Sequence, residues 1–256
     1  MKIVFVGAGN LATAVSLEMQ RVGMTIAQIY SHTETSAERL GKKLGCNWTI
    51  DPQEIITDAD LYIFSLKDSV LKEVIAQVKP NNGLWVHTAG SVAMDVFEGY
   101  TERYGVFYPL QTFSKERRVS LDGTYIFLEL HSPEDEKVLR KVAKALTPNV
   151  ELLSSEKRKT LHLSAVFACN FTNHIYLLAT KLLEEQGIPR KVILPLIDET
   201  AAKIHDMNPS KAQTGPAVRF DKQIMDSQLA MLSDPSMKTL YQLISQNIYK
   251  EVMNNE

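Results

Sequence analysis

The 256-residue sequence predicts an α/β fold, in which a Rossmann-type doubly wound parallel sheet is followed by an all-α C-terminal half. Three observations lead to this class. Short apolar runs alternate with helical patterns as far as residue 153, and this alternation is typical of parallel sheets covered on both faces. Beyond that point strand signals stop, while capped helical patterns continue. A glycine-rich turn directly follows the first strand.

The predicted strands are short, apolar and bounded by Gly, Pro, Asn or Asp. They are Ile3–Val6, Ile26–Tyr30, Leu61–Ser65, Leu84–His87, Val106–Tyr108, Tyr125–Leu130 and Val150–Leu153. Two capping boxes predict helix starts between them. Thr35 pairs with Glu38, and Asp51 pairs with Glu54, with Pro52 at the first helical position.

The sequence of the second half predicts helices. The stretch from Arg158 to Gln186 has neither Gly nor Pro, so it predicts one long helix that Gly187 ends. Further helices are predicted at Arg190–His205, from the cap-and-start pair Asn208-Pro209, and at Asp221–Leu232 and Pro235–Val252. We expect a nucleotide-binding domain at residues 1–154 and a helical substrate and dimerisation domain at 155–256.

Composition excludes several classes of protein. Apolar residues make up 45% and charged residues 23%, as in ordinary globular proteins, and the net charge of −2 does not indicate a nucleic-acid binder. The two cysteines stand far apart and predict neither a disulfide framework nor a zinc site. No apolar run has the length of an export signal or a membrane span, so we expect a cytoplasmic protein. Lys115–Arg118 is a charge cluster, either a solvated loop or an anion contact.

The turn after the first strand fits the dinucleotide-binding pattern G-x-G-x-x-A. Gly7 permits a tight turn, and Gly9 lets a pyrophosphate approach the backbone. Ala12 lets the following helix pack closely on the strand. The amides at the start of that helix would hold phosphate, so we expect Gly7, Gly9, Asn10 and Leu11 to bind the cofactor. The alternative is a tight turn without a ligand.

The end of the second strand favours NADP over NAD. An NAD site needs an acidic residue there for the ribose 2′-hydroxyl. This sequence instead has Ser31, His32 and Thr33 after Tyr30, and Glu34 comes late. Hydroxyl and imidazole groups suit a 2′-phosphate. Ordinary loop chemistry is the alternative for these side chains.

Two later strand ends are expected to flank the nicotinamide half of the cofactor. Ligands in doubly wound sheets lie across the carboxyl ends of the strands. Ser65 and Leu66 follow one such strand, and we expect them to contact the cofactor. His87 ends another, where it either faces substrate or hydrogen-bonds nearby loops.

The long helix is apolar nearly all round, which predicts that it is buried and that a second copy of the chain covers it. His162, Asn170, Asn173 and His174 share one broad side of it. We expect His162 to donate a proton and Asn170 to orient the substrate, with a structural hydrogen-bond network as the alternative. No cluster of carboxylates or cysteines predicts a metal.

A turn signal, Thr214-Gly215-Pro216, precedes Arg219. A helix beginning at Pro216 would aim free amides outward, and the guanidinium of Arg219 suits a carboxylate or phosphate. We therefore expect Thr214 and Arg219 to hold a substrate anion. In the alternative, Arg219 pairs with Asp221 or caps a carbonyl.

Four stretches carry a resemblance to a known family: Val6–Ala12, Tyr108–Phe113, His162–Asn170 and Thr214–Asp221. The chain resembles the 6-phosphogluconate-dehydrogenase-like reductases, including pyrroline-5-carboxylate reductase. More closely, it resembles uncharacterised NADP oxidoreductases that join a Rossmann-like domain to a helical domain of unknown function. The resemblance implies NADP as cofactor and a homodimer built on the helical domains, and it names no substrate.

Two residues depart from the family's pattern. Tyr108 stands where the pattern has His, which leaves an acid–base role at position 108 open, and Phe220 stands where it has Gly. We predict an NADP-dependent reductase of a small carbonyl or imine compound. The alternatives are a non-catalytic NADP-sensing protein and a pyrroline-5-carboxylate reductase.

Overall fold

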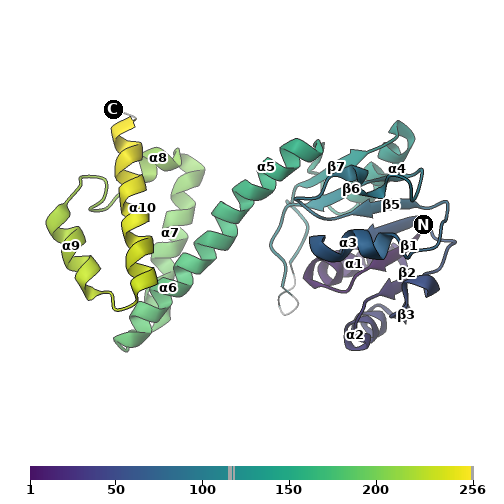
Figure 1. The fold of residues 1–256 in the computed structure, drawn as a ribbon, viewed down its shortest axis with the longest axis horizontal. Coiled ribbons are helices and arrows are strands. Elements are labelled where there is room, and N and C mark those ends of the chain that lie inside the picture. Colours follow the sequence, from purple (N-terminus) through teal and green to yellow (C-terminus); the bar gives the residue numbers. More distant parts are fainter. Residues whose placement is uncertain (115–116, 118, 255–256) are drawn as a thin grey trace. The chain divides into compact units, whose positions relative to one another are not determined.

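The computed structural model describes residues 1–114, 117 and 119–254, so most of the charge cluster at residues 115–118 lies outside the described residues (Figure 1). The chain divides into two compact units, Met1–Asn170 and Phe171–Glu256. The predicted boundary after residue 154 coincides with the start of a helix, but that helix packs with the first unit. The functional division of the chain stays a prediction.

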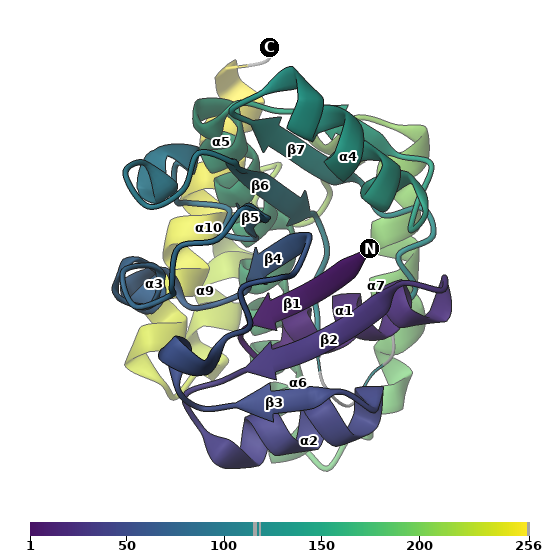
Figure 2. The ribbon, with the colours of Figure 1, turned by 90° about the vertical axis from the view of Figure 1, so that its right-hand side faces the viewer.

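The first unit contains an eight-stranded sheet with the order β3-β2-β1-β4-β5-β6-β7-β8, and its six-strand core order is that of dinucleotide-binding folds (Figure 2). Neighbouring strands are parallel except β6 and β7, which are antiparallel. The predicted doubly wound, mostly parallel sheet is confirmed. The strands are β1 Lys2–Val6, β2 Thr25–Tyr30, β3 Asn47–Thr49, β4 Leu61–Phe64, β5 Leu84–His87, β6 Tyr104–Pro109, β7 Ile126–Leu130 and β8 Val150–Leu152.

Alternation along the strands builds two cores, one on each face of the sheet. Ile3 and Phe5 of β1 belong to one apolar cluster, with residues of three helices. Val4 and Val6 belong to the other, with residues of one helix. The first face is covered by α1 Asn10–Arg21, α2 Glu34–Leu44 and α4 Pro133–Lys144, and the second by α3 Asp68–Ile75.

Three local predictions in this unit were incomplete or wrong. Strand β3 was missed because Asn-Trp-Thr lacks an apolar run. Helix α2 begins at Glu34 after the N-cap Thr33, so the predicted cap at Thr35 is wrong. Asp51 does accept a hydrogen bond from the Gln53 amide at 2.8 Å, but the helix it opens is one 3₁₀ turn, Pro52–Glu54.

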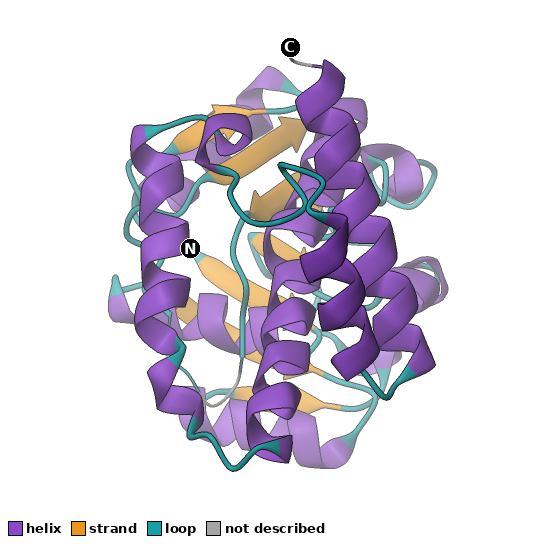
Figure 3. Cartoon of the chain, turned by 90° about the vertical axis from the view of Figure 1, so that its left-hand side faces the viewer, coloured by secondary structure: helices purple, strands orange, loops and turns teal. Residues whose placement is uncertain are grey.

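The helical segments end the first unit and make up the second (Figure 3). The predicted long helix is present, but a π-helical segment divides it. π-Helical turns occur frequently at functional sites. The elements are α5 Ser155–Ala165, the π-helical segment Val166–Phe171, α6 Thr172–Glu185, a 3₁₀ turn Arg190–Val192, α7 Leu194–Asp206, α8 Pro209–Ala212, α9 Lys222–Met231 and α10 Pro235–Asn254.

The prediction that the long helix is buried is wrong for the single chain. Leu163 is 57% exposed and Leu177 is 47% exposed. Within the described part of the second unit, the buried apolar side chains are Ala217 and Leu232. This unit therefore lacks a closed core of its own. Among the described residues, no helix is long and apolar enough to cross a membrane.

The loop before α9 corrects another prediction. No helix begins at Pro216, because residues 216–220 form turns and α9 begins at Lys222. Asp221 caps α9, accepting a hydrogen bond from the Ile224 amide at 3.3 Å. Phe220 has φ +50°, a conformation that glycine adopts without strain. Its ring lies 4.4 Å from that of Tyr249.

Candidate functional site

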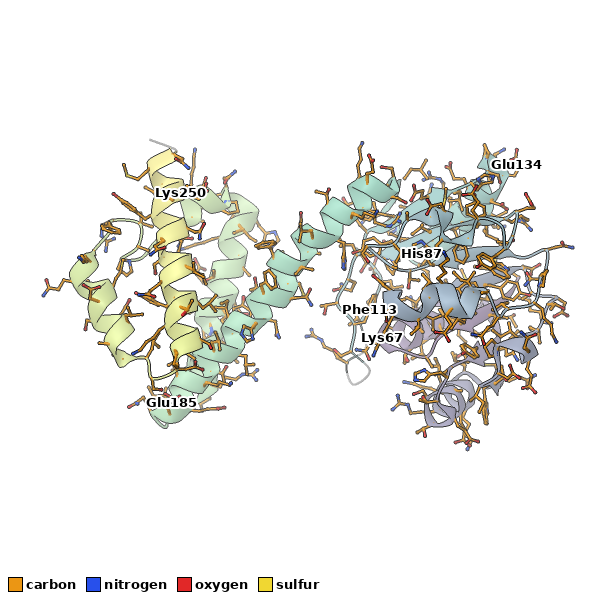
Figure 4. All side chains as sticks on the ribbon, viewed as in Figure 1. Lys67, His87, Phe113, Glu134, Glu185 and Lys250 are labelled. Carbon is orange, nitrogen blue, oxygen red and sulfur yellow. The ribbon has the colours of Figure 1, made fainter. Side chains whose placement is uncertain are left out.

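A cavity of about 640 Å³ lies at the carboxyl ends of β1, β2 and β4. Seven of the predicted cofactor residues line it together, although they come from three separate loops. They are Gly7, Gly9, Ser31, His32, Thr33, Ser65 and Leu66. Lys67, which follows them in the loop after β4, also lines the cavity and is labelled in Figure 4.

The glycine-rich turn leaves room for a dinucleotide. Gly7 has φ +126°, and a Cβ there would collide with the carbonyl oxygen of Ser65. A Cβ on Gly9 would instead meet no atom within 4 Å. Gly9 is the N-cap of α1, and no side chain caps that helix. The open space, the uncapped helix start and its dipole together fit a pyrophosphate.

The polar rim of the cavity fits a 2′-phosphate better than a ribose hydroxyl. Ser31 directly follows β2, where its backbone amide donates to the Thr49 carbonyl at 3.2 Å. His32 and Thr33 are exposed beside it. The positive charge of Lys67 adds to this rim.

Asn10 and Leu11 are not among the residues that line the cavity. The Asn10 side chain donates to the Phe113 carbonyl at 3.0 Å, which ties the loop after β6 to the start of α1. Leu11 packs against the apolar cluster. Their contribution to a cofactor would therefore be limited to their backbone amides.

The role of His87 as a substrate contact stays a prediction, and the structure shows which groups its ring contacts. Its side chain is fully buried in the first unit. Nδ1 accepts a hydrogen bond from the Ala89 amide at 3.1 Å, and Nε2 lies 3.3 Å from the Ala93 carbonyl oxygen. Burial, aided by the Arg158 charge, lowers its pKa to about 3. His87 is thus neutral, and its ring makes the loop hydrogen bonds that the alternative expects.

His162 and Tyr108 form the second part of the site, also within the first unit. The Tyr108 hydroxyl, at the end of β6, lies 3.0 Å from Nδ1 of His162 on α5. His162 packs against the loop after β5, where a Cβ on Gly90 would lie only 2.5 Å from its Cγ. Because Gly90 has no side chain, the imidazole of His162 can approach the carboxyl edge of the sheet. Ligands of this fold lie at that edge.

A buried arginine lies behind this pair. Arg158 is fully buried, and its guanidinium pairs with Glu129 of β7 and bonds the Val92 carbonyl oxygen. Ser155 completes the network, since its hydroxyl donates to Glu129 at 2.7 Å and accepts from Arg158 at 3.1 Å. Burial raises the pKa of Tyr108, and the Arg158 charge opposes that shift.

The remaining predicted residues are not tied to these groups by any recorded contact. Asn170 is exposed in the π-helical segment. Thr214 lines a separate, mostly apolar cavity of about 340 Å³ in the second unit. Arg219 is exposed and forms no ion pair with another described residue, since Asp221 caps α9 instead.

Two family models match different parts of the chain. Residues 2–87 match the family described as NADP oxidoreductase coenzyme F420-dependent. Residues 124–248 match a domain of unknown function, DUF2520. The two matches correspond to the glycine-rich half of the sheet and to the segment from β7 to α10.

Two solved structures are similar to this chain over nearly its whole length, and a third protein is similar over part of it. A crystal structure from Bacteroides fragilis, classed by inference as an NADP oxidoreductase, is 47% identical, with 97% of this chain and 98% of that one covered and a TM-score of 0.92. An imine reductase from Myxococcus stipitatus, solved with NADP⁺, shares the fold at 14% identity, with 99% and 93% covered and a TM-score of 0.68. Mouse pyrroline-5-carboxylate reductase 3 is 29% identical over 103 residues, so the chain spans 38% of its length.

Proposed function

This chain belongs to the NADP oxidoreductases, and on that premise we propose that it reduces a small carbonyl or imine compound. NADP is the family's cofactor, and the cavity at the glycine-rich turn has the space and the uncapped helix start to hold it. The single observation that carries the proposal is the imidazole–phenol pair at the same edge of the sheet as this cavity. It supplies a proton donor where a reductase needs one.

Each group has an assigned task. When bound, NADPH supplies the hydride that such a reduction requires. The turn of Gly7 and Gly9 would hold the pyrophosphate, and Ser31, His32, Thr33 and Lys67 would hold the 2′-phosphate. Ser65 and Leu66 would flank the nicotinamide half.

On the substrate side, His162 would donate a proton to the substrate's oxygen or nitrogen, while Asn170 would orient the substrate. An amide suits that task because it can both donate and accept hydrogen bonds. Thr214 and Arg219 would hold an anionic group of the substrate. The exposed guanidinium of Arg219 has no competing ion pair among the described residues, and its planar fork fits a carboxylate.

The assignment of these residues to the 2′-phosphate predicts a preference for NADPH that one substitution should remove. NADPH should bind at least about tenfold more tightly than NADH, a difference of about 1.4 kcal/mol. Ser31→Asp should remove this preference, because a carboxylate after β2 repels the 2′-phosphate and accepts from a free 2′-hydroxyl. Titration of intrinsic fluorescence with both nucleotides measures the two affinities.

Thr35→Asp is the matched control for this substitution. It adds the same charge at an exposed position of α2 that does not line the cavity, so the preference for NADPH should persist. Equal affinities of the wild-type protein for NADH and NADPH would contradict the assignment.

A homodimer is the assembly we propose. The second unit buries few apolar side chains by itself, and Leu196 and Met231 are 64% and 81% exposed. Surfaces of this kind usually mark an interface, and most soluble oligomers are symmetric homo-oligomers. Light scattering at micromolar concentration should therefore show twice the chain mass, whereas a 28.8 kDa species would refute the dimer. The cytoplasmic location stays a prediction.

Pyrroline-5-carboxylate reductase is the second candidate, favoured by the partial similarity to the mouse protein. Its substrate is a cyclic imine with a carboxylate, which would use both His162 and Arg219. Direct assay with pyrroline-5-carboxylate separates this activity from reduction of other imines or carbonyls.

A further inference from the structure

We propose that the proton delivered by His162 comes from Tyr108, with the imidazole relaying it from the buried phenol to the substrate. This inference rests on the proposed function, and it adds a residue and a direction of proton movement to it. Tyr108 acts through His162, so its role is that of a positioning residue that also stores the proton.

The surroundings of the phenol fix the direction of the hydrogen bond. Tyr108 is only 7% exposed, and the structure records no hydrogen-bond partner for its hydroxyl among the described residues except Nδ1 of His162. Burial raises the pKa of the phenol, which therefore holds its proton. If Nδ1 carried the imidazole proton and donated it to the hydroxyl, the buried phenolic proton would be left without an acceptor, which is costly. Nδ1 is therefore the acceptor, and the neutral imidazole carries its proton on Nε2.

With this arrangement the pair can supply the proton of a reduction while the imidazole of His162 stays uncharged. As negative charge builds on the substrate's oxygen or nitrogen, the Nε2–H bond breaks and an O–H or N–H bond forms on the substrate. The phenolic O–H bond breaks at the same time, and Nδ1 takes that proton. The phenolate left behind lies in the field of the Arg158 guanidinium, which favours the charged form of Tyr108. Solvent returns the proton after product release.

The charged and titratable groups packed around the pair keep their charges during this step. Arg158 on α5 is always protonated, and Glu129 of β7 is held in an ion pair with it. His87 on β5 is neutral because its pKa is about 3. In Tyr108→Phe no phenolic proton can replace the one that leaves Nε2, so kcat should fall below that of the wild-type protein.

A test that needs no substrate measures which tautomer His162 adopts. Long-range ¹H–¹⁵N NMR of the imidazoles, on the full chain with NADPH at about pH 9, distinguishes the two neutral forms, and His162→Gln assigns the signal. One ordinary hydrogen bond should make the ratio of the Nε2–H form to the Nδ1–H form about fivefold larger in the wild-type protein than in Tyr108→Phe.

Tyr125→Phe is the matched control, because it removes a hydroxyl from an exposed tyrosine next to β7 and should leave the tautomer of His162 unchanged. An Nδ1–H form of His162 in the wild-type protein, or an unchanged tautomer in Tyr108→Phe, would overturn the relay. NADPH binding, measured on the same samples, reports separately on the proposed function. If the cofactor fails to bind while the Nε2–H form is present, the proposed function fails and the relay geometry stands.

Discussion

Replacing His162 by Ala is expected to lower kcat by about 10²–10⁴-fold, the usual contribution of a positioned proton donor. In the proposed mechanism His162 is the group from which a proton leaves toward the substrate, and alanine has none to give. The affinity for NADPH should stay near that of the wild-type protein, because His162 does not line the cofactor cavity. Steady-state rates with pyrroline-5-carboxylate and a panel of small carbonyl and imine compounds measure the effect.

His205→Ala is the control for this substitution, since His205 is an exposed histidine of α7 outside the proposed site. Its kcat should equal that of the wild-type protein. Unchanged turnover in His162→Ala would make His162 a structural residue that packs on Gly90. Parallel losses of turnover and NADPH affinity would instead mean that the substitution disturbs the sheet edge as a whole.

Replacing Arg158 by Met should lower the free energy of unfolding of the first unit by about 3–5 kcal/mol. The substitution leaves the Glu129 carboxylate without its cation and the Val92 carbonyl without a donor, both next to a buried network. Breaking one half of such a pair costs more than the pair itself contributes. Urea unfolding followed by tryptophan fluorescence reports on this unit, because both tryptophans, Trp48 and Trp85, lie in it.

Arg140→Met provides the matched comparison. Arg140 also pairs with a glutamate, Glu136, but the two side chains are 30% and 32% exposed on α4. Partly exposed pairs contribute about 1 kcal/mol or less, so the loss should be correspondingly small. A similar small loss in Arg158→Met would show that the buried network does not support the edge of the sheet behind Tyr108.

Much of the sheet unit could be predicted from local patterns. Strand β4 is apolar throughout and β1 is apolar after Lys2, and Gly7 and Gly9 mark the turn of the dinucleotide-binding pattern. Both signals come from a few neighbouring residues. Strand β3 escaped prediction because its three residues pair with β2 without an apolar run. The long helix was mispredicted for another reason, since an apolar sequence predicts burial but does not say whether the same chain provides it.

The candidate site was less predictable because its groups meet only through the fold. Tyr108 and His162 are 54 residues apart, and no periodicity relates a strand end to a helix so much later in the chain. Arg158 gave no signal either, because a basic residue near the start of a helix ordinarily faces solvent. His87 shows the same limit of local patterns. A histidine at the end of a strand suggested substrate binding, whereas two loop contacts occupy both of its ring nitrogens.

Oxidation of bound NADPH in a single turnover tests the central claim most directly. The wild-type protein, loaded with one equivalent of NADPH, would be mixed with pyrroline-5-carboxylate and with each member of the carbonyl and imine panel. The account predicts that at least one compound abolishes the absorbance of the reduced nicotinamide. Retention of that absorbance with every compound, in protein shown by titration to hold NADPH, would contradict it and identify the chain as a non-catalytic NADP-binding protein.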